Sequence, residues 1–149
     1  MQTPKKADLE TAGVVTRAHM QHCIERAQKA PTRDVMQNAV ATAKQFAEVC
    51  EWLADVRGEE YSAASAPHSD ALELVASHLG ERAYSLYCVE NKTPAQCEER
   101  QALMTVRQWV SWIASVAADR RGNLGDWIDD LVYKAREKAR KADPKARID

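Results

Sequence analysis

The chain of 149 residues has the length of one ordinary domain. Hydrophobic residues make up 45% and charged residues 29%, so the chain can bury a core and stay soluble. The net charge of -1 excludes a global field that would attract nucleic acid or a membrane surface. We expect a single helical domain over 1–149, with frayed tails at 1–6 and 143–149.

The start of the chain, MQTPKKADLE, has no apolar run after its lysines, unlike a secretory signal peptide. No stretch approaches the roughly 20 apolar residues of a membrane span. We therefore expect a cytoplasmic protein without membrane contact, in which the four cysteines are reduced. Cys88 and Cys97 flank one turn and could form a disulfide in an oxidising setting.

Turn signals divide the chain into five predicted helices, at 7–29, 32–56, 70–90, 94–120 and 125–141. Thr32 and Ser69 are the predicted N-caps of the second and third helices. At the fourth helix, Thr93 is the cap, Pro94 takes the first helical position and Gln96 completes a capping box. Nothing alternates with a period of two, so no strand is predicted.

Apolar residues recur at three- and four-residue steps, which places them on one face of each helix. The predicted apolar faces are Leu9, Gly13, Met20, Ile24 and Ala27 in the first helix; Val35, Met36, Ala39, Ala43, Phe46, Cys50 and Leu53 in the second; Leu72, Val75, Ala76, Leu79, Ala83, Leu86 and Tyr87 in the third; Leu103, Val106, Trp109, Val110, Ile113, Ala114 and Ala117 in the fourth; and Leu124, Trp127, Ile128, Leu131, Val132 and Ala135 in the fifth. Short connections favour antiparallel neighbours, which predicts an all-α, four-helix up-and-down bundle with an additional C-terminal amphipathic helix.

The stretch RAHMQHC, residues 17–23, gathers groups that could bind a metal. His19, His22 and Cys23 span about 100° of one helix surface, whereas zinc needs about four tetrahedral ligands. The other histidines, His68 and His78, bring no companion ligand at helical spacing. We predict no metal and no cofactor, with Cys23 toward the core, His19 at its edge and His22 toward solvent.

Arg17 and His22 in the same stretch form an R-x4-H pattern. The pattern resembles that of the HEPN ribonucleases, small helical bundles that use such an arginine and histidine to cleave RNA. The resemblance implies catalytic roles for Arg17 and His22 in a metal-independent ribonuclease, which is one alternative function. Five steps along a straight helix turn the chain by about 140°, so the pair would need a distorted helix or a second subunit.

The C-terminal helix is rich in basic residues, namely Lys134, Arg136, Lys138, Arg140 and Lys141. Such a run could bind phosphate backbones, so nucleic-acid binding is a second alternative. The order of charges also suits an isolated helix, because acidic residues begin it and basic residues end it. The pairs Asp130–Lys134 and Glu137–Lys141 have favourable i,i+4 spacing.

Several aromatic residues lie off the apolar faces: Trp52, Tyr84 and Trp112 in helices, and Tyr61 in an acidic loop. Exposed tryptophan and tyrosine are preferred anchors of protein interfaces. The chain has no Gly-rich phosphate loop, nucleophile elbow or H-E-x-x-H motif. These features predict a non-catalytic protein-binding module, an inhibitor, adaptor or accessory subunit of the kind that bacteria and phages encode. The expected partner is another protein, with a homo-oligomer or nucleic acid as alternatives.

Overall fold

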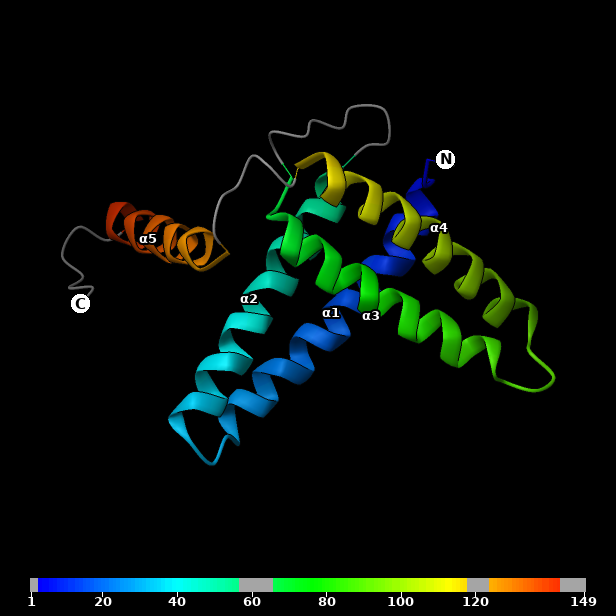
Figure 1. The fold of residues 1–149 in the computed structure, drawn as a ribbon, viewed down its shortest axis with the longest axis horizontal. Helices are drawn as coiled ribbons and strands as arrows, with labels where there is room; N and C mark the ends of the chain where they lie inside the picture. Colours follow the sequence, from blue (N-terminus) through cyan, green and yellow to red (C-terminus); the bar gives the residue numbers. More distant parts are fainter. Residues whose placement is uncertain (1–2, 57–65, 118–123, 143–149) are drawn as a thin grey trace.

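The structure, a computed structural model, describes residues 3–56, 66–117 and 124–142, and all regular structure in these ranges is helical (Figure 1). The helices are α1 (Lys6–Gln28), α2 (Arg33–Asp55), α3 (Ser69–Tyr87), α4 (Pro94–Ala117) and α5 (Leu124–Ala142). The predicted all-α fold is confirmed, and each predicted boundary lies within three residues of the observed one.

Of the three predicted N-cap residues, two are confirmed. Thr32 accepts a hydrogen bond from the backbone N–H of Val35 at 3.3 Å. Thr93 and Gln96 bond each other's backbone N–H groups, at 3.2 and 2.9 Å, as a capping box. The prediction for Ser69 was wrong by one residue, because the imidazole of His68 takes the capping role and accepts from the N–H of Asp70 at 3.1 Å.

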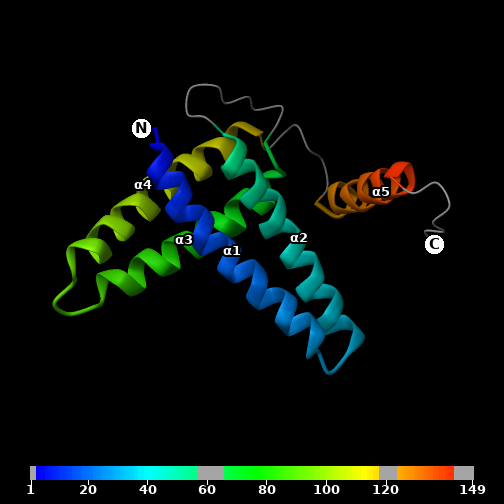
Figure 2. The ribbon, with the colours of Figure 1, turned by 180° about the vertical axis from the view of Figure 1, so that it is seen from behind.

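The first four helices form two antiparallel hairpins, α1 with α2 and α3 with α4 (Figures 1 and 2). The hairpins cross near the start of α1 and the end of α2, and the contact of α1 with α4 is the largest between them. Away from the crossing the hairpins diverge, so that their turns point in different directions (Figures 1 and 2). The helix contacts support the predicted four-helix arrangement in part, because α1 pairs with α2 and α3 with α4 while the two hairpins diverge.

The hydrophobic core lies where the hairpins cross. Its largest buried side chains come from α2, α3 and α4 and include Phe46, Val49, Leu53, Leu72, Val75, Leu79, Leu103, Val106, Val110 and Ile113. Trp52 of α2 stacks on Trp109 of α4, with ring centroids 5.3 Å apart. Since burying one such side chain contributes roughly 1.5–3 kcal/mol, this crossing dominates the stability of the fold.

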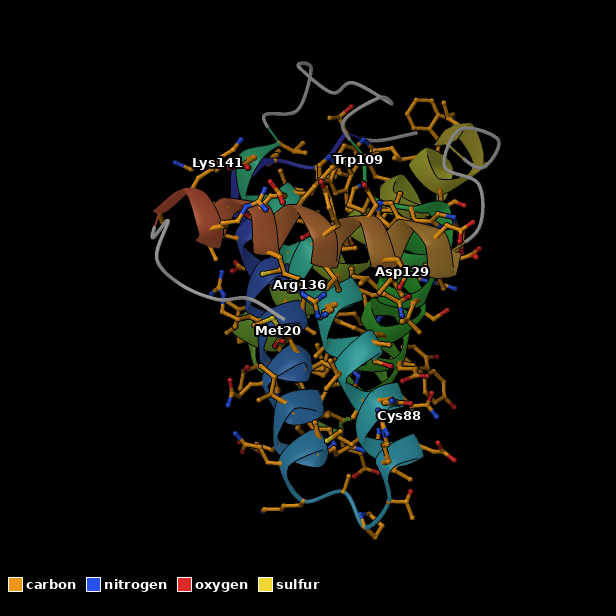
Figure 3. All side chains as sticks on the ribbon, turned by 90° about the vertical axis from the view of Figure 1, so that its left-hand side faces the viewer. Met20, Cys88, Trp109, Asp129, Arg136 and Lys141 are labelled. Atoms are coloured by element: carbon orange, nitrogen blue, oxygen red, sulfur yellow. The ribbon has the colours of Figure 1, made fainter. Side chains whose placement is uncertain are left out.

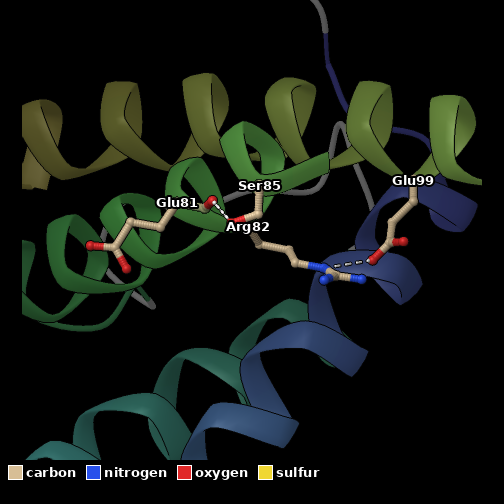
Figure 4. A network of polar contacts seen from close by, with 4 residues as sticks. All are labelled: Glu81, Arg82, Ser85 and Glu99. Atoms are coloured by element: carbon tan, nitrogen blue, oxygen red, sulfur yellow. Dashed lines mark hydrogen bonds and ion pairs between the residues drawn. The ribbon is translucent and has the colours of Figure 1, made fainter. Parts of the chain in front are cut away.

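Two features mark the close approach of α3 and α4. An ideal Cβ built on Gly80 would lie 2.7 Å from Nε of Arg107, so glycine leaves room for the arginine to cross α3. Nearer the hairpin turn, Arg82 donates to Glu99 at 3.3 Å, while Ser85 bonds the carbonyl of Glu81 within α3 (Figure 4). The Arg82–Glu99 pair is exposed, so it contributes at most about 1 kcal/mol.

The fifth helix contacts the rest of the molecule mainly through α2. Trp127 packs against the core, and its ring centroid lies 5.7 Å from that of His68. The other large apolar side chains of α5, Ile128, Leu131 and Val132, are half-buried. This helix is therefore amphipathic, as predicted, and only part of its apolar face is covered.

Several residues predicted for the core lie outside it. Met36 and Tyr87 are exposed, while Met20, Ile24 and Ala27 are half-buried. The side chain of Ala117 lies outside the described residues. Met20 still packs against the core. The other side chains on α1, α2 and α3 lie where the hairpins have already diverged, so only one neighbouring helix remains to cover them.

Candidate functional site

The largely apolar hollow between the outer parts of α1 and α2 is the candidate site, and we call it the open face. It has a volume of ≈ 470 Å³ and is lined by Met20, Ile24, Ala27 and Gln28 of α1 and by Met36, Val40, Ala43, Lys44 and Ala47 of α2. Met20 also packs against the core, so the open face adjoins the crossing at this end. In the view of Figure 3, Met20 lies below α5.

The hollow results from the sizes of the side chains that line it. Ala43 and Ala47 of α2 and Ala27 of α1 are too short to fill the space between the helices. The larger side chains stand around them and stay accessible, with Met36 42% and Val40 38% exposed. Because methionine is flexible and polarizable, such a surface can adapt to the shape of a partner.

Basic side chains flank the open face. Lys44 lines it directly. Arg17 and Arg33 are exposed and lie about 60° around their helices from Met20 and Met36, respectively. The neighbouring acidic residues, Glu25 and Asp34, are turned away from these methionines by about 140° and 160°. Lys44 is thus the one charged side chain among the residues that line the open face.

Two acidic residues of α2, Glu48 and Glu51, follow Ala47, which lines the open face. Burial raises the pKa of Glu48 on α2, and the neighbouring Glu51 raises it further. Lys134 of α5 acts in the opposite direction on this pKa, which places its charge near Glu48. The fifth helix thus brings further positive charge to this side of the molecule.

A histidine cluster lies on the opposite side of α1, between the hairpins. The rings of His19 on α1 and His78 on α3 lie 4.0 Å apart, and Phe46 of α2 lies 4.5 Å from His19. Burial lowers the pKa of both histidines, and the charges of His78 and His22 lower that of His19 further. Glu81 of α3 opposes these shifts in the pKa of both residues.

The sequence prediction missed this cluster because His78 comes from a different hairpin. His22 is exposed and Cys23 fully buried, as predicted. Among the residues that the structure describes, no three histidine, cysteine, aspartate or glutamate side chains are grouped so that they could hold a metal ion. Cys88 and Cys97 are exposed free thiols in the structure.

The four predicted interface aromatics have different outcomes. Trp52 was wrongly predicted to be accessible: it is 8% exposed, because its ring is stacked in the core on Trp109. Trp112 is 47% and Tyr84 68% exposed, which confirms their accessibility and leaves their role as anchors a prediction. Tyr61 lies outside the described residues. Tyr84 and Trp112 belong to α3 and α4, whereas the open face belongs to α1 and α2.

The structure does not bring Arg17 and His22 together within one chain. Arg17 lines a hollow between the start of α1 and the end of α2, together with Gly13 and Cys50. His22 lines a separate hollow near the turn between α1 and α2, together with Arg26 and Pro31. A joint role in catalysis would need a second subunit, as the helix geometry predicts.

The five basic residues predicted as a nucleic-acid surface, Lys134, Arg136, Lys138, Arg140 and Lys141, are all exposed on α5. Lys134 pairs with Asp130 at 2.8 Å, as predicted. Glu137 pairs with Arg140 at 2.7 Å, whereas Lys141 was the predicted partner. These pairs lower the net field of the helix, and nucleic-acid binding stays a prediction.

Comparison of the chain with protein-family models, curated proteins and solved structures finds no match. No helix in the described ranges is both long and apolar enough to cross a membrane. A functional proposal therefore depends on the surfaces described above, of which the open face has the most distinctive shape and chemistry.

Proposed function

We propose that the protein is a non-catalytic protein-binding module that receives a helix of a partner protein in the open face. The observation that carries this proposal is the apolar hollow between α1 and α2, in which Met20, Ile24, Met36 and Val40 remain accessible. Recognition of an amphipathic helix in an apolar groove is a recurring mode of binding, with anchors at i, i+3, i+4 and i+7.

The shape of the open face suits a third helix. Two packed helices have axes about 8–10 Å apart, and the groove between them accommodates a helix about 10–12 Å in diameter. At the crossing, α3 and α4 cover the same two helices on their other side. A partner helix in the open face would likewise turn a two-helix hairpin into a three-helix unit and bury side chains that are now accessible.

The energy available from this contact is moderate. Completing the burial of four partly exposed side chains contributes on the order of 1 kcal/mol each. Association costs about 4–15 kcal/mol in lost freedom, so the partner must add contacts beyond these anchors.

The other two candidate functions lack an assembled surface of this kind. Arg17 and His22 line different hollows. On α5, Lys134 and Arg140 pair with acidic residues of the same helix. The proposal of protein binding rests on the open face and needs neither feature.

Photo-crosslinking in the cells that produce the protein tests the proposal. A photoreactive amino acid replaces Met36 in the open face or, as a control, Val116 on α4, which is 40% exposed. We expect an adduct from position 36 whose partner residue, located by mass spectrometry, lies in an amphipathic helix. The adduct should be lost when Val40→Asp is added, because a charge then occupies the groove.

Two results would contradict the proposal. One is an equal yield of the same adduct from positions 36 and 116, which would indicate non-specific contact. The other is an adduct from position 36 that persists unchanged in the Val40→Asp protein. Circular dichroism of the Val40→Asp protein shows whether the fold is retained, and Val116→Asp provides a matched control for an added surface charge.

A further inference from the structure

We infer that α5 is a membrane-surface helix, which binds the headgroup region of an anionic lipid bilayer through its apolar stripe and the basic residues beside that stripe. This contact is separate from the open face and goes beyond the proposed function. It also differs from the sequence-based expectation of no membrane contact, which considered spanning segments and the charge of the whole chain. The distribution of charge around and along this one helix leads to the inference.

The apolar stripe of α5 is the first step. Of the five helices, α5 separates its apolar from its polar residues most sharply. Successive residues are turned by about 100°, so that Ile128 and Leu131 lie within about 40° of Ala135, and Val132 lies within about 60°. Ala135 therefore marks the middle of the stripe. Helices that lie in a membrane surface combine such a stripe with a strongly charged remainder.

The charged residues of α5 are arranged around this stripe by sign. Four of the five basic residues lie within about 120° of Ala135, and Arg140 lies at about 140°. Those four are Lys134, Arg136, Lys138 and Lys141. Of the acidic residues, Asp129 lies at about 120° from Ala135, and the other three lie at about 140–180°. Those three are Asp126, Asp130 and Glu137. The apolar stripe is therefore bordered mainly by positive charge, while the opposite side of α5 is mainly acidic.

The charge also changes along α5. Residues 124–130 contain three acidic and no basic residues, whereas residues 131–142 contain five basic residues and one acidic residue. All five basic residues are exposed. The start of α5 lies nearest to the other helices, while its second half extends away from them (Figures 1 and 2). The basic half of the helix is thus the part that a second surface can reach.

The contact of α5 with the rest of the molecule is anchored at its start. Trp127 packs against the core and lies beside His68. Further along, Leu131 is only half-buried, and Ala135 is exposed. The charge of Lys134 opposes the rise in the pKa of Glu48 on α2, so these two residues attract each other. An anionic bilayer offers Lys134 several phosphate groups in place of Glu48, while Trp127 can stay where it is.

The arrangement of charge favours a lipid surface over nucleic acid. Nucleic acid binds cations through its phosphates and needs no apolar stripe. On the polar side of α5 it would meet Asp130 and Glu137 beside Arg140. A bilayer instead receives the apolar stripe, while the lysine and arginine side chains beside the stripe extend to the lipid phosphates. Only the lipid contact uses the stripe and its basic border together.

Cosedimentation of the full chain with lipid vesicles tests the inference. We expect binding to phosphatidylcholine vesicles that contain about 30% phosphatidylserine, and at least about tenfold weaker binding to phosphatidylcholine alone, because each basic residue near an anionic surface contributes about fivefold. Arg136→Gln removes one charge beside the stripe and should weaken binding to the mixed vesicles about fivefold. Added salt should weaken it as well, because salt screens exposed charges.

Two nearby positions separate a membrane contact from charge attraction alone. Leu131→Gln places a polar side chain in the apolar stripe without changing the charge, and should weaken vesicle binding about tenfold. Tyr133→Gln is the matched control, because Tyr133 is 63% exposed on the opposite side of α5, and this variant should bind like the wild type. Val40→Asp should also bind vesicles like the wild type, since the open face takes no part in the contact. Circular dichroism shows whether each variant keeps its helical content.

Several results would overturn the inference. Equal binding to the two kinds of vesicle, or binding to neither, would do so without affecting the proposed role of the open face. Binding that Arg136→Gln weakens and Leu131→Gln leaves unchanged would indicate charge attraction alone. Binding of a single-stranded oligonucleotide in place of the anionic vesicles would identify nucleic acid as the partner of α5. Loss of vesicle binding in Val40→Asp would show that the open face, and not α5, meets the lipid.

Discussion

The two ends of the α1–α2 hairpin use the same apolar spacing with different results. At the crossing, Leu9 and Phe46 are buried because α3 and α4 pack against the hairpin. In the outer part, Met20 and Met36 occupy the corresponding stripes and remain accessible in the open face. The comparison shows that the number of neighbouring helices, rather than the apolar pattern itself, decides whether a stripe becomes core or surface.

The side chains at the two ends also differ in kind. The crossing contains rigid aromatic rings, such as the stacked pair Trp52 and Trp109, which fix one packing arrangement. The open face contains methionine, valine and alanine, which leave a hollow and can adjust to a guest. The first composition suits stability, and the second suits binding.

Matched truncations at the two ends should give the largest contrast in stability. Leu79→Ala removes a fully buried side chain at the crossing and should lower the free energy of unfolding by about 2–5 kcal/mol. Met36→Ala removes a side chain that is already 42% exposed and should cost less than about 1 kcal/mol. Urea denaturation measures both, and similar losses for the two variants would contradict the difference between the ends.

Much of this fold could be predicted from local sequence signals. Thr32 and the Thr93–Gln96 capping box define helix starts through hydrogen bonds between residues three apart in sequence, and both are confirmed. Periodicity likewise predicted the buried faces of α3 and α4. Such signals do not depend on how the hairpins are arranged in space.

The errors have one physical cause, which is the relative placement of the hairpins. Met20 and Ile24 have core-like spacing, yet the divergence of the hairpins leaves them in the open face. Trp52 lies off the apolar stripe of α2, but its ring stacks on that of Trp109 in α4. His78 meets His19 only because the hairpins cross there. The periodicity of apolar residues within one helix does not indicate how the two hairpins are placed relative to each other.

A smaller effect on stability is expected from replacing Gly13 in α1 and Gly80 in α3 by alanine. An added Cβ at Gly13 meets nothing within 4 Å, so Gly13→Ala should raise the free energy of unfolding by about 0.5–1 kcal/mol through helix propensity. Gly80→Ala should gain less, because its Cβ would displace Arg107. Thermal denaturation compares them, and a larger gain at Gly80 would contradict the packing described for α3 and α4.

The smallest expected effect is the pH dependence of stability that arises where the rings of His19 and His78 meet. The folded-state pKa values of His19 and His78 lie below their usual value of 6.5, chiefly because of burial. Their contribution to stability is therefore fully present above about pH 6.5 and is lost as the pH falls below it. Because both rings are only partly buried, solvent screening limits the size of this loss.

Substitution of His78 isolates this contribution from that of other groups, such as Glu81, Arg26 and His22. The melting temperature of the wild type should fall between pH 7.5 and pH 5.5 by more than that of His78→Gln. An identical pH dependence in the two proteins would show that the contact between His19 and His78 does not titrate in this range.

Amide hydrogen exchange with and without a designed amphipathic helical peptide, with an apolar stripe of leucine and alanine, tests the central claim most directly. The open face as a helix-binding groove predicts added protection at 20–28 of α1 and 36–47 of α2, with little change along α3 and α4. Protection centred on the exposed aromatics Tyr84 and Trp112, with none in the outer part of the α1–α2 hairpin, would contradict the claim.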